Sequence, residues 1–225
     1  MSARIRSAIF FSFLLTGATA SAADHRSEAI DSAPPKDELA PALQDKFAER
    51  GAKVIRGTSR TVCEFWPTKE WAVQDGFQAK EDRLYPFSPG QLIGLLHFPR
   101  RGKDFRDQTI SSGWYTLRFG LQPTDGNHEG TSPTRDFLLM VPTESDTTNA
   151  PTNIEKLVEA SAEAAGSAHP AMLCLQPAVK TAKNGSVRHD EDRDWWILQV
   201  TSQARVKGKS NELPLSIIVV GHADE

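Results

Sequence analysis

The sequence predicts a mostly β fold: an antiparallel β-sandwich or jelly roll with one or two short helices packed on it. Segments with the alternating or continuous apolar pattern of β-strands far outnumber those with the period of an amphipathic helix. Turns and polar loops join these segments, without the helical crossovers that a parallel sheet needs. An open sheet of the α+β class is the alternative architecture.

The chain is expected to have three parts. We predict a signal peptide at residues 1–22, a flexible lead-in with a short helix at 23–52, and a single β-rich domain at 53–225. A domain of this size can bury a core without disulfides or metals. The formal net charge of −3 gives no electrostatic reason to expect nucleic acid or an anionic membrane as a partner.

Residues 1–22 have the features of a secretory signal peptide in the usual order. Arg4 and Arg6 form a short basic region, residues 8–15 are apolar, and residues 20–22 read Ala-Ser-Ala, a small-residue cleavage site. The apolar stretch is too short to span a bilayer. We therefore expect export to the periplasm or the cell exterior, with no transmembrane segment after cleavage. An uncleaved N-terminal anchor is the alternative.

Two helices are expected. In residues 39–51, apolar side chains fall roughly on one face, and Gly51 is placed to end the helix. The second helix begins at a capping box formed by Thr152 and Glu155, continues with an apolar stripe, and ends at Gly166. Each helix is amphipathic enough to pack on a sheet.

The expected strands are recognised by β-branched and aromatic residues in alternation, or by unbroken apolar runs. Gly94 lies inside one such run, where we expect a bulge or a close backbone approach. The R-R-G-K sequence at residues 100–103 is interpreted as a turn with solvated side chains rather than as a basic patch. The expected strands are residues 61–66, 71–74, 91–98, 113–121, 136–141, 171–176, 195–201 and 215–220.

Cys63 and Cys174 are the only cysteines of the chain, and each lies in an expected strand. In an oxidising compartment, a disulfide that closes so long a loop adds about 4 to 5 kcal/mol in the chain-entropy model, if the geometry permits the bond. Two separately buried thiols are the alternative, because cysteine is also an ordinary core residue.

The long polar loop that ends at Asp136 is the first candidate for a functional site. Asp125, Asn127 and Glu129 alternate, Gly130 follows, and Asp136 stands at the twelfth position, which is close to the spacing of a calcium-binding loop. The flanking strands, and aspartate in place of glutamate at the last position, favour a purely structural loop instead. Calcium is the one cofactor that the sequence suggests.

His128 in the same loop leads to a second hypothesis. Together with His97, His222 and Glu64, it would form a transition-metal or acid–base site if the strand ends converge. A hydrolytic site that pairs His128 with a carboxylate of the loop is a variant of this hypothesis. For His97, which lies in an apolar strand, a hydrogen-bonded core position is the default interpretation.

Tryptophan suggests a third possibility, the binding of carbohydrate. Trp195 and Trp196 are adjacent and must point to opposite faces of their strand, so one of them is a candidate for exposure. Trp114 is a further candidate ligand-binding residue. Exposed aromatic rings can stack on the apolar face of a sugar, although tryptophan in a β protein is more often a core residue.

The familiar catalytic motifs are missing from the sequence. There is no G-x-S-x-G, S-x-x-K, H-E-x-x-H, C-x-x-C, Walker loop or dinucleotide glycine pattern. The first hypothesis is therefore a non-catalytic binding or structural module with an unknown small-molecule, glycan or protein partner. A metal-dependent site at residues 125–136 and a carbohydrate-binding module are the alternatives.

The central strands also carry a resemblance. Residues 113–139 resemble uncharacterised exported bacterial proteins of the planctomycete type, which have G-x-Y-T-L-R-[YF]-G-L-Q-P-x-D-G-N-H followed by R-D-F-L-L. The likeness extends through E-F-W at 64–66, H-P-A at 169–171 and V-G-H-A at 220–223. It implies export and a shared fold but no reaction. It also places the signature on residues 125–128 rather than on Glu129, which weakens the calcium spacing.

Overall fold

The computed structural model describes residues 24–80, 82–123 and 134–223, so the expected signal peptide lies outside the described residues. The prediction of a mostly β fold with a short helix is confirmed within these ranges. The strands are β1 (His25–Ile30), β2 (Gly51–Arg56), β3 (Arg60–Pro67), β4 (Glu70–Ala72), β5 (Leu92–Phe98), β6 (Gly102–Lys103), β7 (Thr109–Ile110), β8 (Gly113–Leu121), β9 (Asp136–Pro142), β10 (Met172–Gln176), β11 (Ser186–Asp190), β12 (Trp195–Val206) and β13 (Lys209–Val220). The helices are η1 (Lys36–Glu38), a single 3-10 turn, and α1 (Ile154–Ala165).

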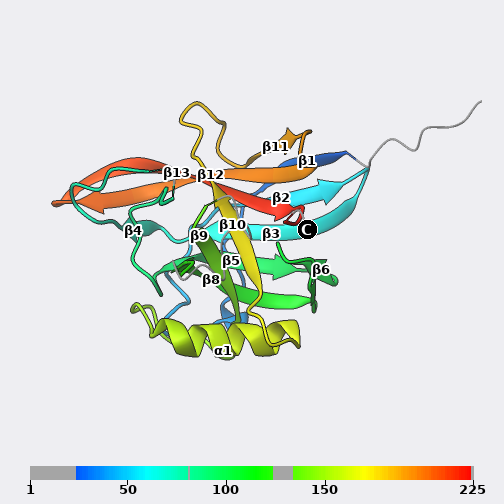
Figure 1. Ribbon diagram of the computed structural model, residues 1–225, viewed down its shortest axis with the longest axis horizontal. Coiled ribbons are helices and arrows are strands. Elements are labelled where there is room, and N and C mark those ends of the chain that lie inside the picture. The colour runs from blue at the N-terminus through cyan, green and yellow to red at the C-terminus, as the bar shows by residue number, and fades with distance from the viewer. Residues whose placement is uncertain (1–23, 81, 124–133, 224–225) are drawn as a thin grey trace, which may run out of the picture.

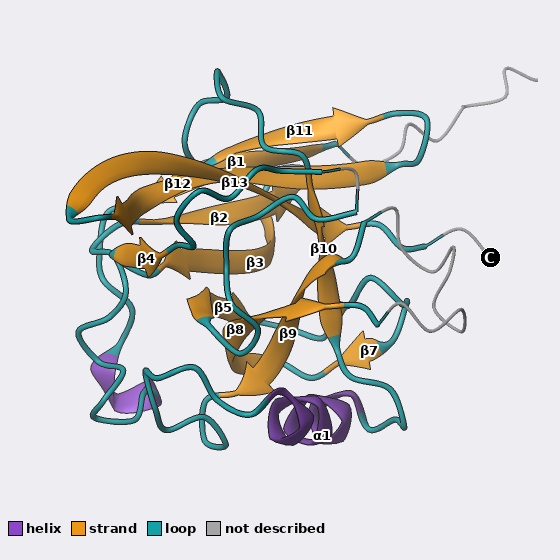
Figure 2. Ribbon diagram, turned by 60° about the vertical axis from the view of Figure 1, so that its left-hand side comes forward, coloured by secondary structure: helices purple, strands orange, loops and turns teal. Residues whose placement is uncertain are grey.

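Most strands belong to one large sheet with the order β1-β2-β3-β5-β8-β9-β10-β13-β12-β11. Every neighbouring pair in this order is antiparallel, and the short β4 adds a parallel pairing on β12. The sheet curls back on itself into two facing layers, with α1 on the outside of one layer (Figure 1). The curl brings the two edge strands, β1 and β11, side by side (Figures 1 and 2).

The largest hydrophobic cluster fills the inside of this curl. It draws alternate side chains from strands on both layers, such as Phe65, Leu117 and Ile217, which are all fully buried. A second cluster lies between the outer face of the sheet and α1, where Leu157 packs near Leu139. The period-two alternation of the strands thus supplies two cores, one on each side of the same sheet.

Helix α1 matches its predicted bounds, but its N-terminal cap differs. The Asn153 side chain accepts a hydrogen bond from the Glu155 N–H, while the Thr152 hydroxyl bonds to the Ala150 carbonyl, so the expected capping box is replaced by an asparagine cap. Gly166 ends the helix in the left-handed conformation, with φ 59°, as predicted.

The lead-in differs more from its prediction. Residues 25–30 form β1, which pairs along its length with β2, and residues 41–46 form turns rather than an α-helix. Leu43 and Phe47 are nevertheless buried, and they pack with Trp66 in a third, smaller cluster. A one-sided apolar spacing can be satisfied by turns as well as by a helix, because tertiary packing decides between them.

Two sequence details were resolved by the fold. The register of β5 shifts next to Gly94, and a Cβ there would lie 2.4 Å from the Phe65 ring, so the expected bulge and close approach are both confirmed.

No disulfide joins Cys63 to Cys174: Cys63 lies in the cluster inside the curl, and Cys174 lies in the cluster beneath α1. In the described part of the chain, no helix is long and apolar enough to cross a membrane.

Candidate functional site

A pocket of about 310 Å³ opens at the end of the curl where β1, the β2–β3 hairpin, the end of β5 and the end of β13 meet. Its lining includes the buried residues Phe98 and Val219, together with the half-buried Val62. Its rim is strongly cationic, and we call the whole the basic pocket. The cations of the rim are Arg56, Arg60, Arg100, Arg101, Lys103 and Arg193, joined by His25 and His222 and by the acids Asp107 and Asp194.

The β2–β3 hairpin places two of these arginines opposite each other. The chain turns after Arg56 at Gly57, whose φ of 61° suits a residue without a side chain, and Arg60 then pairs with Arg56 across the two strands. His25 pairs with Arg56 from the other side. Three adjacent strands therefore carry a row of His25, Arg56 and Arg60. Like charges directly opposite each other destabilise a sheet unless something between them carries the opposite charge.

The segment after β5 supplies the next pair of arginines. Arg100 and Arg101 follow Phe98 in an exposed turn, and Gly102 then starts β6 close against the Phe98 ring, where a Cβ would lie 2.6 Å away. Because glycine allows this close approach, the turn is held against Phe98, which lines the same pocket. Both arginines are exposed at its rim.

The charges of the basic pocket are only partly neutralised. Lys103 pairs with Asp107 at 3.1 Å, and Arg193 lies 3.6 Å from Asp190. In the described parts of the chain, no ion pair or hydrogen bond involves the guanidinium groups of the other four arginines that line this pocket. We call these the four unpaired arginines: Arg56, Arg60, Arg100 and Arg101.

The pKa of His25 responds to the positive charge at this end of the molecule. Burial lowers the pKa of His25 below its ordinary value, and the charge of Arg56 lowers it further. Asp24 and Asp194 act in the opposite direction but do not reverse the shift. The His25 ring packs against Trp196 in a tilted arrangement, with ring centres 4.7 Å apart. The lowered pKa disfavours the charged form of His25, so the positive charge of the rim rests mainly on its arginines and Lys103.

The central loop on which the metal hypotheses depend falls mainly outside the described residues. Asp125, Asn127, His128 and Glu129 are all in the undescribed segment, so the calcium and hydrolytic hypotheses stay predictions. Asp136 is described and is fully buried. Its two carboxylate oxygens accept hydrogen bonds of 2.8 and 3.0 Å from the backbone N–H groups of residues 84 and 85, so in this structure Asp136 anchors a neighbouring loop.

The expectation that Trp195 or Trp196 is exposed is not met, because both are buried. The Trp195 indole donates a hydrogen bond to the His222 carbonyl, and Trp196 stacks on His189 with ring centres 4.0 Å apart. Trp114 is half-buried and is stacked on His97 at 4.1 Å. With their rings engaged by protein, these tryptophans give no support to the carbohydrate-stacking hypothesis.

His97 and Glu64 are brought together, but in the middle of strands rather than at strand ends. His97 Nδ1 lies 2.7 Å from Glu64 Oε2, and the two residues are direct cross-strand partners on β5 and β3. Lys53 is in turn opposite Glu64, and Glu28 is opposite Lys53. The pair therefore belongs to a ladder of complementary side chains across the sheet, which is a structural role. The predicted partner His222 lies at the rim of the basic pocket.

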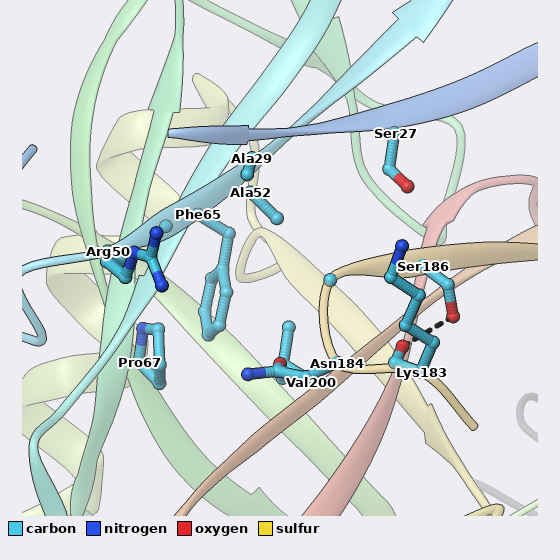
Figure 3. Close-up of a pocket in the computed structure, with 12 residues that line it drawn as sticks. Ser27, Ala29, Arg50, Ala52, Phe65, Pro67, Lys183, Asn184, Ser186 and Val200 are labelled. Atoms are coloured by element: carbon cyan, nitrogen blue, oxygen red, sulfur yellow. Dashed lines mark hydrogen bonds between the residues drawn. The ribbon is translucent and has the colours of Figure 1, made fainter. Parts of the chain in front are cut away.

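Two other hollows are less suited to a charged ligand. A pocket of about 300 Å³ lies farther along the β1–β11 seam, where Arg50 and Phe65 face Lys183, Asn184 and Ser186 (Figure 3). Of its two cations, Arg50 is already paired with Asp31 at 2.7 Å, so Lys183 is the one cation of this pocket without an ion pair among the described residues. A more open hollow of about 580 Å³ lies beside the β12–β13 hairpin and is lined largely by apolar side chains such as Leu84 and Leu213.

No known protein family, curated protein or solved structure matches this chain. Sequence reasoning missed the basic pocket because it interpreted residues 100–103 as a solvated turn and gave no role to the β2–β3 turn. One signal was available: R-G-T-S-R at residues 56–60 places arginines on both sides of a glycine-containing turn. The convergence of that turn with residues 100–103 depends on the curl of the sheet, which no local pattern reveals.

Proposed function

We propose that the protein is an exported, non-catalytic binding module that holds an anionic ligand in the basic pocket. The observation that carries this proposal is the set of four unpaired arginines around one pocket of a chain whose formal net charge is negative. A guanidinium group presents a planar fork of N–H donors that matches a carboxylate, sulfate or phosphate group. The opposite placement of Arg56 and Arg60 is costly without such a group between them.

The expected affinity for a single small anion is modest. The four unpaired arginines are exposed, and one exposed ion pair contributes about 0.2–1 kcal/mol because water screens the charges. Several such contacts to one ligand add up, whereas salt weakens them, with a screening length of about 10 Å at 0.1 M. Binding should therefore be readily measured at low ionic strength and decrease steeply as salt is added.

The proposal is tested by calorimetric titration of the purified protein with inorganic pyrophosphate at low ionic strength. We expect saturable binding that Arg56→Glu and Arg100→Glu each weaken by about tenfold or more, which corresponds to about 1.4 kcal/mol per factor of ten. Each substitution replaces an attraction with a repulsion on an exposed side chain, so neither should affect folding.

The matched control is Lys209→Glu. Lys209 is exposed at the opposite end of β13 from Val219, about 33 Å away at the usual rise of a strand. This substitution changes the net charge of the protein by the same amount but leaves the pocket intact. An equal loss of binding in all three variants would indicate a response to net charge alone and would contradict the proposal. So would unchanged binding in the two arginine variants.

A further inference from the structure

We infer that the natural ligand of the basic pocket is an acidic polysaccharide, bound as an extended chain across the mouth of the pocket. This inference rests on the proposed function and specifies its ligand class. The first ground is the amount of unpaired positive charge. Arg56 and Arg60 face each other across a strand pair, where opposite Cβ atoms are about 5 Å apart, so one anionic group between them can meet both. Arg100 and Arg101 form a second pair on another segment.

Two separate pairs of arginines call for a ligand with at least two anionic groups. A single carboxylate or sulfate group that binds one pair leaves the other pair unneutralised. Lys103 and Arg193, which extend the rim, have carboxylate partners of their own and add little further unpaired charge. A polymer with an acidic group on each repeating unit supplies the required series of charges, because successive units reach successive pairs.

The second ground is that the cations are placed for a ligand that crosses the surface. All of the four unpaired arginines are exposed; Arg56 and Arg60 lie at the strand ends that flank the β2–β3 turn, and Arg100 and Arg101 lie in the turn after β5. The lining of the pocket also includes two half-buried apolar side chains, Val62 and Val220. The C–H face of a sugar ring can pack on these two valines while its acidic substituent points to the arginines.

A single-stranded nucleic acid fits these features less well. Proteins bind it by stacking its bases on exposed aromatic side chains in a basic groove. Apart from imidazoles, the one aromatic side chain among the described residues that line the pocket is Phe98, which is only 1% exposed. The His25 ring is already in contact with Trp196. The pocket thus supplies cations without a surface on which bases could stack.

The test is a titration of the full-length mature protein with oligogalacturonates of increasing length, from the monomer to the octamer. We expect at least tenfold tighter binding of the tetramer than of the monomer, with little further gain for longer chains. Neutral oligogalactose of the same length should not bind measurably. Arg56→Gln and Arg100→Gln should each weaken tetramer binding several-fold and reduce its salt dependence, whereas Lys209→Gln should change neither.

Different outcomes separate failure of the ligand class from failure of the proposed function. Equal affinity for the monomer and the tetramer, or tighter binding of oligo-dT with the same number of charges, would overturn the polysaccharide inference. If pyrophosphate still bound in an arginine-dependent way, the proposed anion-binding function would stand in either case. If neither pyrophosphate nor any oligomer bound, the proposed function itself would be wrong.

Discussion

Arginine has two opposite roles in this protein, and the difference lies in whether its N–H groups have partners. Arg118 is fully buried in the middle of β8. Its Nε and Nη2 atoms each donate to the Asp146 carboxylate at 2.7 Å, and its remaining donors reach the carbonyl groups of Gly90, Thr148 and Ala150. Arg56 and Arg100, in contrast, are exposed and lack such partners among the described residues. The first role is structural, and the second leaves the side chain available to a ligand.

Arg118→Met should destabilise the protein strongly. The substitution leaves the Asp146 carboxylate buried with only the Thr116 hydroxyl as a polar side-chain partner, and breaking a buried ion pair in this way costs about 3–5 kcal/mol. The loss should be seen as a lower midpoint in urea unfolding. Arg101→Met, an exposed substitution in the basic pocket, should change the free energy of unfolding by no more than about 0.5 kcal/mol. Similar free energies of unfolding for the two variants would show that Arg118 does not hold residues 146–150 in place.

At the scale of elements, the feature that defines this fold is the seam between the edge strands β1 and β11. The two strands approach each other at one end through aromatic rings: Trp196 on β12 stacks on His189 of β11 and contacts His25 of β1. The Nδ1 atom of His25 is buried and has no hydrogen-bond partner among the described residues. The seam is therefore held partly by an imidazole that is poorly suited to carry a proton.

This arrangement predicts a loss of stability in mild acid. Because burial and Arg56 lower the pKa of His25, the unfolded chain takes up a proton at this residue at a higher pH than the folded protein does. The contribution of His25 to stability is thus fully present above its ordinary pKa of 6.5 and decreases as the pH falls below that value. Asp24 and Asp194 oppose the shift, and His189 adds to it.

His25→Phe should reduce this acid sensitivity, because phenylalanine can stack on Trp196 but cannot be protonated. Urea unfolding at pH 7.5 and pH 5.5 should show a smaller loss of stability for the variant than for the native protein. His169→Gln, at an exposed loop position, is the control and should behave like the native protein. An identical pH dependence of all three proteins would contradict the role assigned to His25.

The sequence predicted the central elements well and the edge elements poorly. β3, β5, β8 and β9 were recognised because they are buried and therefore strongly apolar. β1 and β11 were missed because edge strands need only pair their backbones on one side, and their sequences H-R-S-E-A-I and S-V-R-H-D show no clear alternation. The expected strand at 71–74 overlaps β4, which pairs in parallel with β12.

At the scale of the whole molecule, the proposed binding of an anion depends on where the curl of the sheet places charged side chains. The formal net charge of −3, considered for the chain as a whole, gave no electrostatic reason to expect nucleic acid or an anionic membrane as a partner. The fold nevertheless gathers arginines from residues 56–60 and 100–101 around one opening. Average charge could not predict this site, because binding depends on the local potential at the pocket rather than on the total.

The most direct test of the basic pocket is to locate a bound anion by NMR. Backbone amide shifts of the labelled protein would be followed during a titration with pyrophosphate at low ionic strength. We predict that the largest changes fall on residues 56–62, 98–103 and 219–222, which line or adjoin the pocket, and that Arg56→Glu requires about tenfold more pyrophosphate to produce them. Changes spread evenly over the surface, or centred on the apolar hollow near Leu213, would contradict the assignment of the basic pocket as the ligand site.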